Sequence, residues 1–179
     1  SLEHDDIDYL HQLVRAGHAL ASHSYRHINV KAKTLEQLQV VYRNDPALAA
    51  RVTAQPAPTA FEVIQRELRD TREVVRNKLG VDLRGFRTPG GFSNGLHDAP
   101  EFRALLKQED YSYVSSHYDF RAASTPRPSR ETLEAALSSS LDHLQPYRYS
   151  DGLLELPMMG LGDIGAFRLL DLERAEWLQ

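Results

Sequence analysis

Two histidines four positions apart, His23 and His27, are the residues of this chain whose type and spacing point most directly to chemistry. They follow a short apolar segment, Ala19-Leu20-Ala21. Neutral imidazole is the commonest nitrogen ligand for zinc-like ions, and two ligands separated by one helical turn can converge on one point. The pair is therefore a candidate part of a metal site. Two surface imidazoles at the start of a helix are the alternative interpretation.

Two further segments bring polar groups to the ends of predicted strands. Arg87-Thr88-Pro89-Gly90-Gly91 is expected to form a loop after a strand-like run at residues 81–86. Ser115-Ser116 ends another strand-like run, which begins at Tyr111. Chemistry in α/β folds gathers at the carboxyl ends of strands, so we expect these groups and the histidine pair to lie on one face.

Each of these groups also has a structural interpretation. Arg87 can form a salt bridge, and Pro89-Gly90-Gly91 is a common turn sequence. Ser115 and Ser116 lack the G-x-S-x-G turn of a nucleophilic serine, which favours strand-end hydrogen bonds. Glu155, near the end of another predicted strand, can equally be an ion-pair partner.

Helices and short apolar runs alternate along the chain and would position these groups. Apolar periodicity predicts helices at residues 7–14, 35–41, 61–79, 100–108 and 133–144. Short apolar or alternating runs predict strands at residues 19–21, 81–86, 111–116 and 153–156. Gly17 and Gly80 are placed to end helices, and Thr34 with Gln37 has the spacing of a capping box. The alternation predicts an α/β fold, either a barrel or a layered sheet.

Length and composition bound the fold and its partners. The chain has 179 residues, which suits a single domain over residues 1–179 with a long connection around 28–60. The net charge of -4, with Lys and Arg scattered, argues against a nucleic-acid partner. The absence of Cys excludes disulfides, thiolate metal sites and a Cys nucleophile. No apolar run approaches the roughly 18 residues of a membrane span.

Together these segments resemble the polysaccharide deacetylase family with the NodB-type domain, also called carbohydrate esterase family 4. Residues 16–27, AGHALASHSYRH, look like the family's second motif, a glycine and a strand followed by H-S/T-x-x-H. Residues 83–91, LRGFRTPGG, look like its third motif, R-x-P-x-G. Residues 152–157, GLLELP, are similar to a late strand of the family. The resemblance spans about residues 5 to 160.

The resemblance implies a (β/α) barrel and hydrolysis of the N-acetyl group of an amino sugar. His23 and His27 match the two metal-binding histidines, which in the family share a divalent ion, usually zinc, with an aspartate from an earlier motif. Arg87 matches the arginine that orients the catalytic carboxylate. Gly90 has the position whose backbone N–H helps to stabilise the oxyanion, where tyrosine is frequent in the family.

Parts of the family pattern are not found. Nothing before His23 resembles the T-F-D-D strand that supplies the catalytic base and the third ligand, because Asp5-Asp6 lacks a preceding apolar strand. The last motif, an apolar run that leads to a histidine general acid, is not found either. Val114 stands where many relatives have Asp, so the partner of Arg87 is open, with Asp110 and Asp119 as candidates.

These matches and departures leave three hypotheses. The first is a distorted or incomplete (β/α) barrel of the NodB type within a longer parent chain, a zinc-dependent hydrolase that removes N-acetyl groups from amino-sugar polymers or oligomers. A second chain or a missing segment then completes the barrel, and the isolated chain has little activity. The second is a non-catalytic NodB-like module that binds carbohydrate or forms an interface. The third is a related amidase acting on small amides, with the insertion around 28–60 covering the site.

Overall fold

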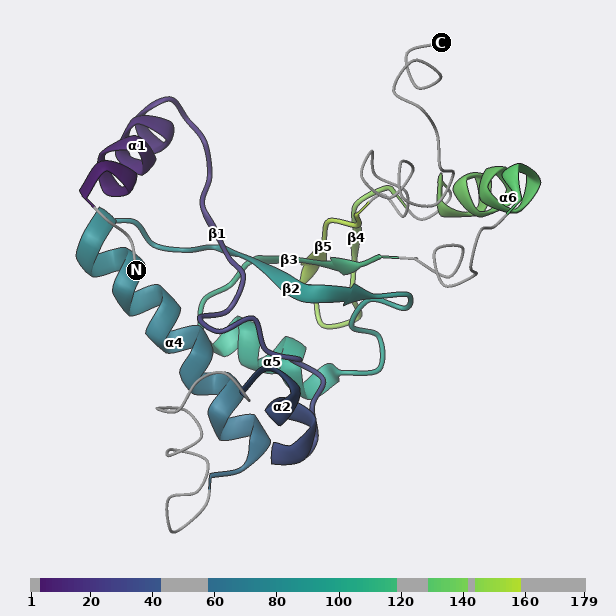
Figure 1. Cartoon of the computed structure of the whole chain (residues 1–179), viewed down its shortest axis with the longest axis horizontal. Helices are drawn as coiled ribbons and strands as arrows, with labels where there is room; N and C mark the ends of the chain where they lie inside the picture. Colours follow the sequence, from purple (N-terminus) through teal and green to yellow (C-terminus); the bar gives the residue numbers. More distant parts are fainter. Residues whose placement is uncertain (1–3, 43–57, 119–128, 142–143, 159–179) are drawn as a thin grey trace. The chain divides into compact units, whose positions relative to one another are not determined.

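The computed structural model describes residues 4–42, 58–118, 129–141 and 144–158 (Figure 1). Within these ranges the elements are α1 (His4–Arg15), β1 (Ala21–Ser22), α2 (Leu35–Tyr42), α4 (Ala60–Leu79), β2 (Gly85–Phe92), α5 (Pro100–Gln108), β3 (Tyr113–His117), α6 (Arg130–Leu141), β4 (Tyr147–Arg148) and β5 (Leu154–Glu155). The described strands follow the sheet order β1-β2-β3-β5-β4. β1 pairs with β2 in parallel, and β4 pairs with β5 antiparallel. The predicted α/β class is confirmed, and the barrel stays a prediction.

The chain divides into two compact units, which are described separately. The first comprises Ser1–Gly90 and Ala99–Val114, and the second comprises Gly91–Asp98 and Ser115–Gln179. None of the helices in the described ranges has both the length and the apolar character needed to cross a membrane.

Helix α4 has the strongest local signals in the first unit. The Thr59 side chain accepts the N–H of Glu62 at 3.2 Å, and the Glu62 carboxylate accepts the N–H of Thr59 at 2.7 Å, which completes a capping box. At the other end Gly80, with φ of 65°, donates its N–H to the carbonyl of Arg76. The predicted helix and its stop at Gly80 are confirmed, while the box at Thr59 was not predicted.

The predicted capping box at Thr34 and Gln37 forms only in part. The N–H of Gln37 donates to the Thr34 hydroxyl at 3.4 Å, but the Gln37 amide oxygen accepts from the N–H of Lys33 instead. Helix α2 still begins at Leu35, as the sequence predicts. Leu38 of this helix is fully buried, so this part of the predicted insertion contributes to the core. Residues 43–57 of the insertion lie outside the described residues.

The core of the first unit fixes strand β2. Phe86 is fully buried, and its ring packs edge to face on Phe102 of α5 and on Tyr111, at centroid distances of 5.7 and 5.9 Å. Burial of an aromatic side chain of this size contributes about 1.5–3 kcal/mol. Phe86 therefore anchors the backbone directly before Arg87. Helix α5 has the bounds that the sequence predicts.

Strand β2 corrects one sequence prediction. Residues 87–91 were expected to form a loop, but β2 continues through them to Phe92. The turn residues still leave a mark, because Gly90 and Gly91 have φ of 84° and 86°. Strand pairing depends on neighbouring strands and on burial, and here it overrides the local preference of Pro and Gly for a turn.

Candidate active site

His23 and His27 lie in a tight loop after β1, so their convergence is not the helical convergence that their spacing suggested. Ser24 and His27 have left-handed backbones, with φ of 60° and 58°. The Ser24 hydroxyl accepts the N–H of Ile28 at 3.1 Å, which closes the turn. As a result, the two exposed imidazoles meet edge to face with centroids 4.9 Å apart.

The second motif segment is held by the backbone of the third. Nδ1 of His23 lies 3.1 Å from the carbonyl oxygen of Arg87. A carbonyl can only accept, so this contact assigns the proton of the neutral ring to Nδ1. Nε2 of His23 then carries the lone pair. Metal-binding histidines have this arrangement, because a carbonyl that accepts from one ring nitrogen orients the other toward the ion.

The loop is also held from helix α4. The buried carboxylate of Glu67 accepts the backbone N–H of Arg26 at 2.8 Å and its Nη1 at 2.6 Å. The guanidinium of Arg26 also lies over the ring of Tyr25, 4.8 Å from its centroid. Desolvation by burial raises the pKa of Glu67, and the hydrogen bonds from Arg26 oppose that shift. Glu67 is a residue that the motif analysis missed.

The position of Glu67 in the sequence carries a signal that could have identified it. The buried face of α4 includes Ala60, Val63, Ile64 and Leu68. Glu67 lies on the same face, one helical turn after Val63 and Ile64. A charged residue in an apolar stripe needs a partner, because burial of an unpaired carboxylate is costly. The stripe alone does not indicate which loop supplies that partner.

The other predicted site residues belong to β2. The Arg87 side chain is exposed, while its backbone carbonyl accepts a hydrogen bond from Nδ1 of His23. Gly90 is exposed too, and a Cβ added there would meet nothing within 4 Å. The tyrosine that is frequent at this position in relatives therefore has room but would need the unfavourable φ of 84°. Thr88 is buried, and its hydroxyl finds no hydrogen-bond partner among the described residues.

The donor set of the loop fits part of a metal site. Two imidazoles, one with its tautomer set, are borderline ligands of the type that zinc accepts. Among residues 4–42, 58–118, 129–141 and 144–158, no group of three or more metal-ligating side chains occurs. Asp5 and Asp6 lie in helix α1. Asp110 pairs with Arg72 at 3.7 Å, and Asp119 is outside the described residues.

Ser116 and Glu155 form a separate network in the second unit. The fully buried Glu155 carboxylate accepts from the N–H of Ser116, the N–H of His117, the Ser116 hydroxyl and the Tyr149 hydroxyl, at 2.6 to 2.9 Å. Burial raises the pKa of the Tyr149 phenol, which keeps it a donor. Ser116 thus makes the predicted strand-end hydrogen bonds. The buried hydroxyl of Ser115 does not, because it has no hydrogen-bond partner among the described residues. In these contacts Glu155 accepts hydrogen bonds from neutral groups.

The fold and the loop define a mixed α/β domain with a paired-histidine site. The sequence profile described as polysaccharide deacetylase matches residues 4–114, which contain both motif segments. The chain belongs to the polysaccharide deacetylase family, as predicted, and this assigns the domain to hydrolases that act on N-acetyl amide bonds. The late strand at 152–157 lies beyond the matched residues. No curated protein and no solved structure matched the chain.

Proposed function

We propose that His23 and His27 are ligands of a catalytic divalent ion, with zinc as the ion, in a deacetylase of N-acetylated amino-sugar polymers or oligomers. The observation that carries this proposal is the contact from Nδ1 of His23 to the Arg87 carbonyl. The ring held by this contact lies against the ring of His27. It supports a preorganised ligand, since one nitrogen is anchored while the other is left to bind.

The chemistry of the site divides among few groups. A divalent ion held by these imidazoles supplies Lewis-acid polarisation of an amide carbonyl and a water of lowered pKa. In this proposal the Arg87 guanidinium orients a carboxylate base, and the Gly90 N–H donates to the oxygen on which negative charge develops. The third ligand and the base come from outside the described residues. An additional segment or a second chain supplies them and completes an incomplete (β/α) barrel.

Metal content and acetate release test the proposal. We expect the wild-type chain to bind zinc, and His23→Ala combined with His27→Ala to remove it, as measured by mass spectrometry of the metal. His18→Ala, an exposed histidine of the same unit, is the matched control and should keep the zinc. Unchanged zinc in the double variant would overturn the metal assignment. When a segment with the T-F-D-D motif, the Asp-bearing segment, is supplied to the chain, we expect acetate release from acetylated chito-oligosaccharides.

A non-catalytic module is the second candidate function. It is favoured by the absence of a third metal-ligating side chain near the histidine pair in the described ranges. A module would bind the oligosaccharide without release of acetate, even after the Asp-bearing segment is supplied. Binding without turnover in that assay would favour the module over the enzyme.

A further inference from the structure

We propose that Glu67 is a positioning residue that holds the His23–His27 loop in its metal-binding conformation. The inference rests on the proposed function, because it assumes that the two imidazoles bind an ion. Glu67 comes from helix α4, 41 positions along the chain from Arg26, and belongs to neither family motif.

The contacts of Glu67 restrain backbone and side chain at once. One carboxylate oxygen accepts the Arg26 N–H at 2.8 Å, which fixes the Tyr25–Arg26 peptide between the two histidines. The other accepts Nη1 of Arg26 at 2.6 Å. The same guanidinium covers one face of Tyr25, so the hold extends over consecutive residues between the two histidines.

The loop needs such a restraint because its backbone is strained. Left-handed conformations of residues other than glycine cost about 1–2 kcal/mol each, and Ser24 and His27 both adopt one. Helix α4 contacts β1, the strand that leads into the loop, so it is a rigid base for the restraint. A carboxylate from this helix can hold a geometry that the loop would otherwise leave.

Burial of Glu67 argues that geometry, and not stability alone, explains its presence. The residue is 2% exposed in a stripe that is otherwise apolar. An apolar residue there would avoid the desolvation of a charge, and replacement of a buried ion pair by apolar groups is often neutral or stabilising. What an apolar residue cannot supply is a pair of acceptors aimed at Arg26.

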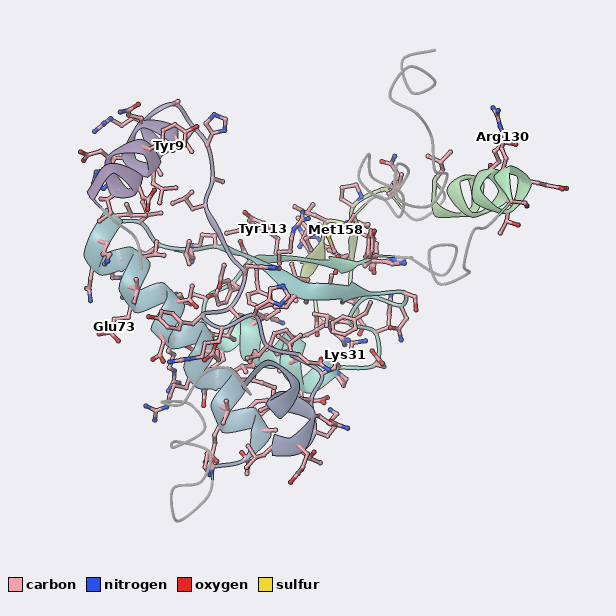
Figure 2. The ribbon with its side chains drawn as sticks, viewed as in Figure 1. Tyr9, Lys31, Glu73, Tyr113, Arg130 and Met158 are labelled. Atoms are coloured by element: carbon pink, nitrogen blue, oxygen red, sulfur yellow. The ribbon has the colours of Figure 1, made fainter. Side chains whose placement is uncertain are left out.

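Zinc affinity of matched variants tests the proposal. Glu67→Gln keeps the shape but removes one acceptor, and Glu67→Asp keeps the charge but shortens the reach. We expect both to weaken zinc binding about 10–100-fold, the range for residues that orient metal ligands. Glu73→Gln, an exposed glutamate that points away from the same helix (Figure 2), should bind zinc as the wild type does.

Calorimetric zinc titration of the full chain is paired with circular dichroism of the metal-free proteins. Weaker zinc binding by folded Glu67 variants, with the Glu73 control unchanged, supports the positioning role. Wild-type affinity in folded Glu67→Gln overturns it and leaves the proposed function standing. If Glu67→Gln does not fold, Glu67→Asp decides by the same criterion. Absence of zinc binding by the wild type overturns both the proposed function and this inference.

Discussion

Nδ1 of His23 lies 3.1 Å from the carbonyl oxygen of Arg87, although the two residues are 64 positions apart. This contact joins the second and third motif segments through a backbone group. It gives Arg87 a role that does not depend on its side chain. Substitution of the Arg87 side chain should therefore leave the orientation of His23 in place, while distortion of strand β2 should disturb it.

Gly90 should resist restoration of the family tyrosine. Gly90→Tyr places a side chain at φ of 84°, which costs about 1–2 kcal/mol of folding stability for an L-residue. Because a Cβ there meets nothing within 4 Å, Gly90→Ala should lose a similar amount. Urea unfolding of both variants measures the effect. A stable Gly90→Tyr protein beside a destabilised Gly90→Ala protein would show that the backbone is not the cause.

A side chain at Gly85 should destabilise the first unit. A Cβ at this position overlaps the ring of Tyr113, and the overlap should cost about 1–3 kcal/mol in Gly85→Ala. Removal of the ring in the double variant Gly85→Ala with Tyr113→Ala should recover part of that loss relative to Tyr113→Ala alone. Strict additivity of the two changes in a double-mutant cycle would contradict the predicted contact.

Glu62 should make part of the stability depend on pH. Hydrogen bonding by Thr59 holds the pKa of the Glu62 carboxyl below its ordinary value of 4.5. A carboxyl whose pKa is lower in the folded state stabilises the folded protein above pH 4.5. This contribution is lost as the pH falls through the folded-state pKa. The stability difference between wild type and Glu62→Gln should therefore shrink from about pH 7 to about pH 3 in urea unfolding. An equal difference at both pH values would contradict this.

Glu155 should matter for the second unit and not for metal binding. Glu155→Gln replaces an acceptor of hydrogen bonds by an amide nitrogen that faces donors, a mismatch that costs about 1–3 kcal/mol or more. Thermal unfolding should report the loss, with zinc content unchanged. Ser116→Ala, which removes one donor and keeps the carboxylate, should lose less. Loss of zinc in folded Glu155→Gln would contradict this prediction.

The sequence predicts those parts of the fold that local signals control. Helix α4 has an apolar stripe and ends at Gly80, and α5 has Pro100 at its first position, so both were correctly located. The strand predicted at residues 81–86 overlaps β2 only at residues 85–86, because the bounds of β2 depend on pairing that local residues do not encode. Helix α6, Arg130–Leu141, begins earlier than its leucine repeat suggests.

The candidate site also has parts that the sequence predicts and parts that it does not. Residue type and motif order indicated His23 and His27 as partners, and the structure brings their rings together. The way in which they meet, through left-handed residues and a hydroxyl contact, does not follow from their spacing. Glu67 is distant in sequence and belongs to no motif, so its contact with Arg26 emerges only from the packing of α4.

Proton–nitrogen correlation NMR of the histidine side chains tests the central claim most directly. In the metal-free protein we expect His23 to carry its proton on Nδ1, because the Arg87 carbonyl accepts it. Addition of zinc should shift Nε2 of His23 and a ring nitrogen of His27 together, while Nδ1 of His23 keeps its proton. A proton on Nε2 of metal-free His23, or spectra that zinc leaves unchanged, would contradict the account.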